Sequence, residues 1–219
     1  AGVGYLPSVA VGACLLIPLK HAKTDGDRIL GVIRGSAITH SGKTIGFGAP
    51  STKAETSLIK AALKNSNLDP SDIHYVEAAA NGYSQGDAVE ISALKKIWSM
   101  NEQPNPLGSV KYTLGHAEAA SGVTLFAKVL FQFEENVLVP TRAPKQVNSD
   151  IDFEGTPFKL VDKLSPWIDK YDELGVAVPK RALINSFGAG GAYASLIIEQ
   201  YRDSSGGPRP ASCAAEYIF

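Results

Sequence analysis

The sequence predicts an α/β fold in which helices pack on the faces of a mixed sheet. Short apolar runs typical of strands alternate along the chain with amphipathic stretches typical of helices, and layered α/β domains have this order of elements. Near the C-terminal end, the apolar runs 181–187 and 193–200 flank the glycine-rich stretch 188–191. Because glycine permits a tight reversal of the chain, these two runs predict a closing hairpin.

The other strands are predicted from apolar runs and from alternation. The continuous apolar run from Gly12 to Leu19 predicts a buried strand, in which Cys14 acts as a small buried apolar residue. The stretch from Arg28 to Ile38 alternates and predicts a long strand. Shorter strands are expected at 73–79, in the segment that includes Lys111, at 137–140 and at 158–161.

Three helices are predicted from apolar residues at helical spacing. Ser51 caps the first helix, 53–65, whose apolar stripe consists of Leu58, Ile59, Ala62 and Leu63. Gly86-Asp87 begins and caps the second helix, 88–98. The third helix follows His116 and ends near Asn136. The stretch 141–156 is expected to be irregular, and 167–175 is expected to be a polar surface excursion.

The composition is that of an ordinary globular protein. The chain has 219 residues, a net charge of −1, 20% charged residues and 44% hydrophobic residues. Without a basic excess, nucleic acid and anionic membranes are not expected as partners, and no apolar run reaches the length of a membrane span. Two cysteines far apart in the sequence imply no disulfide framework, so a reducing cytoplasm is the expected location.

One α/β domain is expected over residues 1–201, followed by a linker rich in proline, glycine and serine over 202–219. The chain does not begin with Met, and we expect that it starts inside a domain. Trp98 and Trp167 are expected in the core, whereas His21 and His74 are expected at surface or strand positions without a role.

The stretch from Gly108 to Gly122 carries the strongest chemical pattern. A short strand leads through a glycine turn into a helix, which places His116 at the rim of a sheet where its ring can face a cleft. Lys111 lies five residues upstream and is close enough to share that cleft. A lone histidine is more often a satisfied core residue. A buried lysine beside it needs a partner, however, and the two together favour a functional site.

Three segments carry long, ordered motifs: VEAAANGYSQGDAVE at 76–90, GSVKYTLGHAEAASG at 108–122 and NSFGAGGAYA at 185–194. They resemble V-E-A-H-G-T-G-T-x-x-G-D-P-I-E, G-S-V-K-S-N-x-G-H-x-E-A-A-x-G and S-S-F-G-F-G-G-T-N-A, the motifs of the C-terminal half of a ketosynthase. More narrowly, the chain resembles a domain of a modular polyketide synthase, and the resemblance extends to about Tyr201. It implies the C-terminal half of a thiolase-like layered fold.

The resemblance also implies a reaction. In this family a cysteine accepts an acyl chain from the phosphopantetheine of an acyl carrier protein. Two histidines then support decarboxylation of an extender unit and formation of a carbon–carbon bond. His116 matches the second histidine and Lys111 the buried lysine, for which Glu118 is an expected charge partner. The expected substrate-binding residues are Asn81, Tyr83, Thr113, Phe187, Gly188 and Ala189.

The chain departs from the family pattern at several of these positions. Ala79 stands where the first catalytic histidine is expected, and losing one oxyanion donor typically lowers the rate by about 10²–10³. Asn81 and Tyr83 replace two threonines that contact pantetheine, and Ala189 replaces a gating phenylalanine. Tyr193 and Ser195 replace the asparagine and the final histidine of the T-N-A-H run.

The nucleophilic cysteine of the family is also missing. Neither Cys14 nor Cys213 lies in the T-A-C-S-S setting of the family. We therefore expect a half-domain that depends on an N-terminal ketosynthase half carrying the cysteine, with an acyl carrier protein and a homodimer of the full domain as further partners. An exposed apolar face is expected on this chain alone. No cofactor is expected, other than the phosphopantetheine of the carrier protein. No metal is expected, because His116 and Glu118 lack further ligands at metal spacing.

Three functions follow from this pattern. The chain is part of a non-condensing ketosynthase that only hands an acyl chain on, or it is a structural or chain-length partner without catalysis. In the third, the chain is part of a condensing ketosynthase in which another group, such as His40, replaces the lost histidine. The stretch Gly188 to Gly191 is a hairpin turn rather than a phosphate loop, because no Lys-Ser/Thr follows it.

Overall fold

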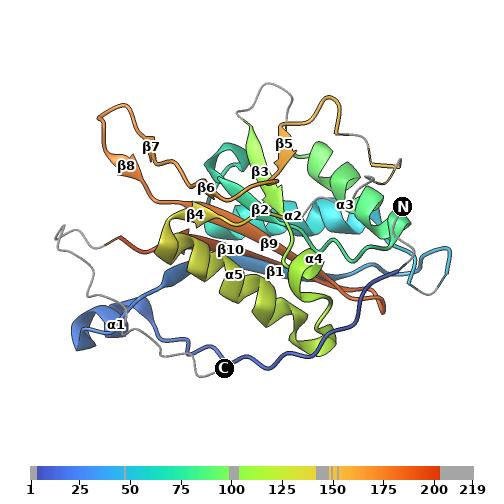
Figure 1. Ribbon diagram of the computed structural model, residues 1–219, viewed down its shortest axis with the longest axis horizontal. Coiled ribbons are helices and arrows are strands. Elements are labelled where there is room, and N and C mark those ends of the chain that lie inside the picture. Colours follow the sequence, from blue (N-terminus) through green and yellow to red (C-terminus); the bar gives the residue numbers. More distant parts are fainter. Residues whose placement is uncertain are drawn as a thin grey trace.

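The computed structural model describes residues 4–46, 48–98, 104–141, 148, 150–151 and 153–202. Their central element is a six-stranded sheet with the strand order β1-β10-β9-β2-β3-β5 (Figure 1). Strands β9, β2, β3 and β5 run parallel to one another. Strand β10 is antiparallel to both of its neighbours, β1 and β9. The predicted mixed sheet is therefore confirmed.

The strands of the antiparallel part of this sheet, β1, β10 and β9, are long, whereas β2, β3 and β5 are short. Their bounds are β1 (Gly31–His40), β2 (Tyr75–Glu77), β3 (Asn105–Gly108), β5 (Phe158–Leu160), β9 (Arg181–Phe187) and β10 (Ala192–Gln200). Two small two-stranded sheets add β4 (Val137–Leu138) with β6 (Ser165–Pro166), and β7 (Lys170–Tyr171) with β8 (Ala177–Val178). The closing hairpin predicted from the sequence is the β9–β10 pair.

The helices are α1 (Leu19–Asp25), α2 (Thr52–Ser66), α3 (Ser84–Lys95), α4 (Lys111–Leu114) and α5 (Ser121–Glu135), with short 3₁₀ turns at Pro70–Asp72 and Glu118–Ala120. Ser51 caps α2 through a hydrogen bond from Ala54 N, as predicted. The predicted cap at Gly86-Asp87 is wrong, because α3 begins at Ser84 and Asp87 lies inside its first turn.

Helices cover both faces of the sheet, and neighbouring strand residues point to opposite layers. Val76 and Leu183 pack with α2 and α3 in one apolar cluster. Tyr75 and Ile184 pack with α5 in the other. This alternation follows from the period of two along a strand. The result is a three-layer arrangement with two separate apolar cores, which confirms the predicted helices on the faces of a mixed sheet.

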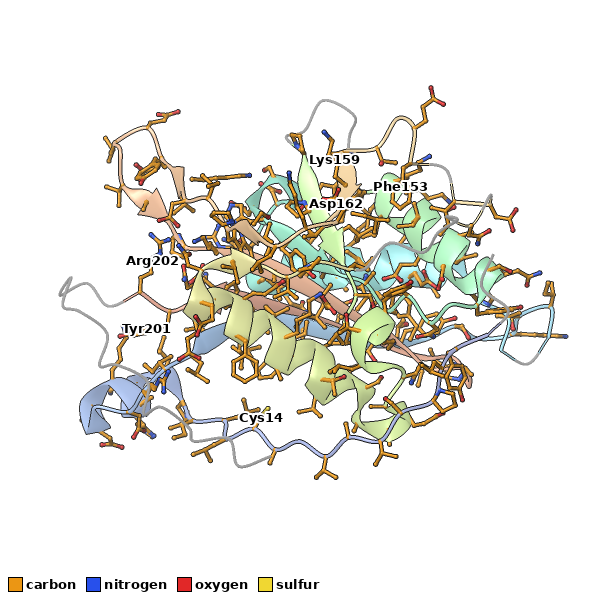
Figure 2. All side chains as sticks on the ribbon, in the orientation of Figure 1. Cys14, Phe153, Lys159, Asp162, Tyr201 and Arg202 are labelled. Carbon is orange, nitrogen blue, oxygen red and sulfur yellow. The ribbon has the colours of Figure 1, made fainter. Side chains whose placement is uncertain are left out.

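The strand predicted from Gly12 to Leu19 is wrong for this structure. Figure 1 shows this stretch as an extended segment that runs along α5 without a strand partner, and α1 begins at Leu19. Val9 and Val11 are 98% exposed and Leu15 is 85% exposed. Cys14, labelled in Figure 2, is exposed rather than buried. The apolar pattern is typical of a buried segment, but no described residue of this chain covers it.

This segment belongs to the exposed apolar face that the sequence led us to expect. Further large apolar side chains are exposed on β1 and on α5, including Ile38 and Phe131. Large apolar side chains exposed on neighbouring elements are typical of a protein–protein interface. No helix among the described residues is long and apolar enough to span a bilayer.

The stretch 167–175 is less polar than predicted. Trp167 is buried, as Trp98 is, and both belong to the core as expected. The rest of the stretch leads into the β7–β8 hairpin, which projects from the body (Figure 1) and exposes Ile168, Tyr171 and Leu174. The predicted linker lies outside the described residues after Arg202, and so does Cys213.

A buried polar group joins β2 to α5. Lys128 Nζ lies 2.7 Å from Glu77 Oε2 and donates to Tyr75 Oη at 2.8 Å, and the Tyr75 hydroxyl donates to the same carboxylate. Glu77 Oε1 also accepts from Val110 N at 2.6 Å. A buried ion pair needs such additional hydrogen bonds to offset the loss of water. This pair therefore fixes the turn that follows β3.

Gly108 permits this group to form, and replacing it is expected to destabilise the chain. A Cβ at position 108 would lie 2.3 Å from Tyr75 Oη and 2.9 Å from Thr141 Oγ1. Because neither atom can move without breaking the buried network, Gly108→Ala is expected to lower the free energy of unfolding by about 1–3 kcal/mol. Urea denaturation followed by circular dichroism measures the change. Gly122→Ala is the matched control, since its Cβ meets no atom within 4 Å. Equal stability of the two variants would contradict this account.

Candidate active site

The candidate site lies at the carboxyl ends of the parallel strands. Ala79 follows β2, Lys111 follows β3, and Phe187 ends β9, and β2 pairs in parallel with both neighbours. In open α/β sheets, ligands bind outside this edge. Lys111 is the first residue of α4 rather than part of a strand, which corrects the sequence prediction.

Lys111 and Glu90 hold the loop at 79–81 from two sides. Lys111 Nζ donates to Ala79 O and to Asn81 Oδ1, each at 2.6 Å. Glu90 of α3 accepts from Ala79 N at 3.0 Å and from Ala80 N at 3.1 Å. Ala80 has a φ of 32°, which is unfavourable for a residue with a side chain. The loop is therefore kept in a strained shape by two buried charges.

A second layer of polar residues supports Glu90. Asn185 of β9 donates from Nδ2 to Glu90 Oε1 at 3.0 Å, and Ser195 Oγ donates to Asn185 Oδ1 at 2.7 Å. All three residues are buried. Ser195, which departs from the family pattern, thus serves as a structural hydrogen-bond donor beneath the loop.

Burial dominates the electrostatics of this cluster. It raises the pKa of Asp87 to about 7 and that of Glu55 to about 9, with the charge of Glu90 as the second cause in both cases. Glu55 is therefore protonated at neutral pH, which spares Glu90 a second negative neighbour. Burial also lowers the pKa of Lys111, while Glu90, Glu77 and Asp87 oppose that change.

His116 follows the end of α4, where Gly115 has a φ of 82°. Its Nδ1 accepts from Glu118 N at 3.0 Å, so the neutral ring carries its proton on Nε2. Burial, and then the charge of Lys111, lower the pKa of His116 below its usual 6.5. At neutral pH the side chain is therefore an uncharged hydrogen-bond donor at Nε2.

The N-terminal segment covers one side of His116. Its backbone pairs with position 116 through His116 N to Leu6 O at 2.8 Å and Ser8 N to His116 O at 3.0 Å. The centre of the Tyr5 ring lies 4.8 Å from the centre of the imidazole, and the Tyr5 hydroxyl donates to Glu118 Oε1 at 2.5 Å. Tyr5 and Glu118 therefore restrict the orientation of the imidazole.

The residues predicted for the site fall into two groups. The structure brings Ala79, Asn81 and Lys111 into direct contact and places His116 close enough to feel the charge of Lys111. The other group consists of Tyr83, Thr113, Phe187, Gly188 and Ala189. Among the described residues, no hydrogen bond, ion pair or ring contact joins these five to Lys111 or His116.

The members of the second group have their own local contacts. Tyr83 Oη donates to Gln85 Oε1 at 2.7 Å, and the side chain is 45% exposed. Phe187 packs against Tyr193 with the ring centres 5.0 Å apart. Gly188 and Ala189 lie in the exposed turn of the β9–β10 hairpin, and Thr113 is exposed on α4.

Comparison with known proteins identifies the family. Residues 30–144, more than half of the chain, match the family described as "Beta-ketoacyl synthase, C-terminal domain". The chain belongs to the beta-ketoacyl synthase family. It is 44% identical over 208 residues to the polyketide synthase PksR of Bacillus subtilis (strain 168), which covers 93% of this chain and 8% of PksR. It is 37% identical to the polyketide synthase ThaQ of Burkholderia thailandensis, over 96% of this chain and 10% of ThaQ.

Solved ketosynthase domains have the same fold. The oxazolomycin ketosynthase domain OzmH KS7 of Streptomyces albus JA3453 is 40% identical with a TM-score of 0.88, over 92% of this chain and 35% of that domain chain. The ketosynthase from module 6 of the bacillaene synthase of Bacillus subtilis 168 gives 37% and 0.79, over 84% and 33%. These similarities confirm the expected thiolase-like fold. The chain is part of a polyketide synthase ketosynthase domain and spans about a third of such solved chains.

Two expectations for this ketosynthase segment are wrong. Lys111 does not pair with Glu118, whose carboxylate instead accepts from Tyr5; the carboxylates that act on Lys111 are Glu90, Glu77 and Asp87. His74 was expected at a surface or strand position without a role; it directly precedes β2 and is buried, and it has a partner. Its Nδ1 accepts from Arg181 N at 3.1 Å, and its pKa is lowered to about 4, chiefly by burial.

The sequence reasoning also missed Glu90, the residue that holds the loop. A signal was present, since Glu90 lies between Val89 and Ile91 on the inward side of a predicted helix. A carboxylate at such a position needs buried donors. Among the described residues, no group of three or more His, Cys, Asp or Glu side chains is arranged to hold a metal ion.

The pKa of His116 is expected to depend on the charge at position 111. Lys111→Met removes a cation that disfavours imidazolium, so the pKa of His116 should rise, while Lys111→Arg keeps the charge and should leave it low. Titration of the imidazole Cε1 proton by NMR measures both, with Lys53→Met, an exposed lysine of α2, as a control. An unchanged His116 pKa in Lys111→Met would show that this electrostatic coupling is absent.

Proposed function

We propose that this ketosynthase segment hands an acyl chain from one carrier protein to the next without extending it. The acyl carbon would leave the pantetheine sulfur of a carrier protein and bond to a cysteine sulfur, and the pantetheine thiol would take the proton. The return step would release the acyl chain to the next carrier. Neither step needs decarboxylation of an extender unit.

The observation that carries the proposal is the methyl group at position 79. Ala79 directly follows Val76-Glu77-Ala78, the V-E-A of the family motif, and its backbone is fixed by Lys111 and Glu90 in a loop that could present a side chain. A methyl group donates no hydrogen bond, so a developing enolate oxygen would lack one of its two imidazole donors. The support of the loop is thus complete although the catalytic side chain is missing.

His116 keeps what acyl transfer requires. Attack on a thioester generates one oxyanion, and a neutral imidazole with its proton on Nε2 can donate to it. The ring is already oriented by Glu118 N and by Tyr5, so little reorganisation is needed. One donor of this kind is consistent with transfer and leaves condensation unsupported.

The nucleophile and the carrier are proposed partners. The extended apolar segment at 9–17 and the exposed side chains of β1 and α5 support an N-terminal ketosynthase half that covers this face and brings the cysteine. An acyl carrier protein would deliver the thioester, and a homodimer of the full domain is part of the proposal. The cytoplasm is the proposed location.

Restoring the histidine tests the proposal. Ala79→His in the complete ketosynthase domain should raise formation of the extended β-ketoacyl thioester by about 10²–10³ over the unmodified domain, because one oxyanion donor is returned. Ala79→Leu adds volume without a donor and serves as the matched control. Products are measured by mass spectrometry with an acyl carrier thioester and a malonyl carrier. Efficient extension by the unmodified domain would overturn the proposal.

The second candidate function is a structural or chain-length partner without catalysis. Tyr83, at a position where a small pantetheine-contacting residue is expected, favours it by its bulk. Incubation of the complete domain with an acyl carrier thioester separates the two functions. Acyl transfer predicts an acylated cysteine, lost or strongly slowed in His116→Ala, whereas a silent partner predicts no acylated cysteine in either protein.

We do not propose His40 as a replacement for the lost histidine. Its Nε2 donates to Gly190 O at 3.1 Å, and its Nδ1 accepts from Gly42 N at 3.0 Å. Both ring nitrogens are therefore engaged at the turn of the β9–β10 hairpin. A histidine held in this way stabilises the turn and has no free nitrogen for an oxyanion.

A further inference from the structure

The side chain of Asn81, in the loop after β2, is held from two directions. The backbone amides of Asn81 and Gly82 donate to the carboxylate of Asp87 on α3. The side-chain oxygen Oδ1 of Asn81 accepts from Lys111 Nζ at 2.6 Å. Glu90 holds the two preceding amides of the same loop. The Asn81 carboxamide is therefore fixed by the protein itself.

The lysine also determines which way the carboxamide points. An ammonium group has only donors, so the amide atom next to it is the oxygen, and the Nδ2 group with its two N–H donors is directed elsewhere. Within the described part of the chain, Nδ2 has no hydrogen-bond partner and is not one of the buried unpaired polar atoms. Asn81 is half-buried. Nδ2 thus reaches open space at the edge of the sheet.

The contact with Lys111 makes Nδ2 a stronger donor than the amide of a solvated asparagine. Burial lowers the pKa of Lys111, but the carboxylates of Glu90, Glu77 and Asp87 oppose this change and favour the ammonium form. A cation on the carbonyl oxygen draws electron density from the amide N–H groups. Hydrogen bonds in such a chain strengthen one another by about 10–30% each.

His116 supplies a second donor at the same edge. Its Nδ1 accepts from Glu118 N, which leaves Nε2–H free to donate. Lys111 contacts Asn81 directly and its charge acts on His116, so both donors surround one ammonium group. Oxyanion holes are built from fixed donors of this kind, and asparagine amides and histidine rings both occur in them.

We infer that the Asn81 carboxamide is an oxyanion donor in acyl transfer and acts together with His116. The inference rests on the proposed function, because it needs a thioester under attack. The cysteine sulfur bonds to the acyl carbon, and the electron pair of the carbonyl bond moves to the oxygen, to which Asn81 and His116 donate. The pair then returns as the bond from carbon to the pantetheine sulfur breaks, and that sulfur takes the proton that the cysteine released.

This role differs from the pantetheine contact expected at position 81. Lys111 already engages Oδ1, so the group that Asn81 offers to a substrate is a donor. A pantetheine contact contributes to binding and changes the carrier concentration that gives half-saturation. A donor to an oxyanion acts on the rate at saturation, because the oxyanion exists only during the reaction.

Asn81→Asp in the complete ketosynthase domain tests the inference. The carboxylate keeps the contact with Lys111 but has no N–H to donate. The rate of cysteine acylation at saturating acyl carrier thioester should fall by about 10²–10³, with half-saturation unchanged. Asn81→Leu removes the donor without adding a charge and should lower the rate similarly. Mass spectrometry of the intact domain after rapid quenching measures both.

Gln85→Glu is the matched control. It makes the same change from amide to carboxylate on an exposed residue in the first turn of α3, and it should leave the acylation rate unchanged.

An acyl dithioester separates an oxyanion donor from a structural role. Sulfur accepts hydrogen bonds weakly, so Asn81→Asp should slow acylation from the dithioester far less than acylation from the thioester. Equal slowing of the two substrates would overturn the inference, and so would a raised half-saturation at an unchanged rate.

The same assay keeps this inference apart from the proposed function. Equal acylation rates of the unmodified and Asn81→Asp domains would overturn the role of Asn81 and leave acyl hand-over intact. Efficient extension by the unmodified domain would overturn hand-over without extension, while the ratio of the two acylation rates would still decide on Asn81. An unmodified domain that is never acylated would overturn both.

Discussion

The backbone at Ala79 is held between a buried ammonium and a buried carboxylate, and the arrangement of the site depends on this. Lys111 donates a hydrogen bond to the carbonyl oxygen of Ala79, while Glu90 accepts hydrogen bonds from the amide groups of Ala79 and Ala80. Each charge would be costly to bury alone, and the loop supplies part of the hydrogen bonding that makes burial possible. The positive φ of Ala80 persists because contacts on both sides oppose its relaxation.

A second buried ion pair supports the residues around Lys111. Glu77 and Lys128 form this pair beneath the turn after β3, and Glu77 accepts a hydrogen bond from the backbone N of Val110, the residue before Lys111. Position 111 is thus fixed by one charge pair and in turn fixes the loop at 79–81. In this ketosynthase segment two buried sets of charged contacts therefore shape the candidate site, one above the other. A methyl group can replace an imidazole at position 79 without removing any of the hydrogen bonds that shape the loop.

Much of the fold could be predicted from local pattern. The stripe of α2 and the apolar runs of β9 and β10 are local signals, and each of these elements forms where its own residues predict it. The segment at 12–19 shows the limit of this reasoning. Its apolar pattern indicates burial correctly in kind, but burial needs a covering surface, and no described part of this chain provides one. Pattern alone therefore could not say that Cys14 is exposed.

The site was predictable in its motifs and less so in its contacts. Lys111 contacts Ala79 and Asn81 and its charge acts on His116, because parallel strands present their carboxyl ends at one edge. The catalytic and binding roles of these residues stay predictions. The partner of Lys111 was missed, since Glu118 is near in sequence while Glu90 reaches the loop from another helix. Spacing along the chain carries no information on such a long-range contact. His74 was missed for the same reason, because its partner is the backbone of β9.

The exposed, extended stretch at 9–17 has a consequence when this segment is produced alone. Among the described residues its peptide groups have no backbone partners, and its side chains are apolar and uncharged. Such a stretch pairs readily with any free sheet edge, including that of another copy. This segment produced alone would then need a covering partner to stay dispersed. Expression of this ketosynthase segment, residues 1–219, by itself is expected to yield aggregates unless Val9, Val11 or Leu15 is replaced by a charged residue.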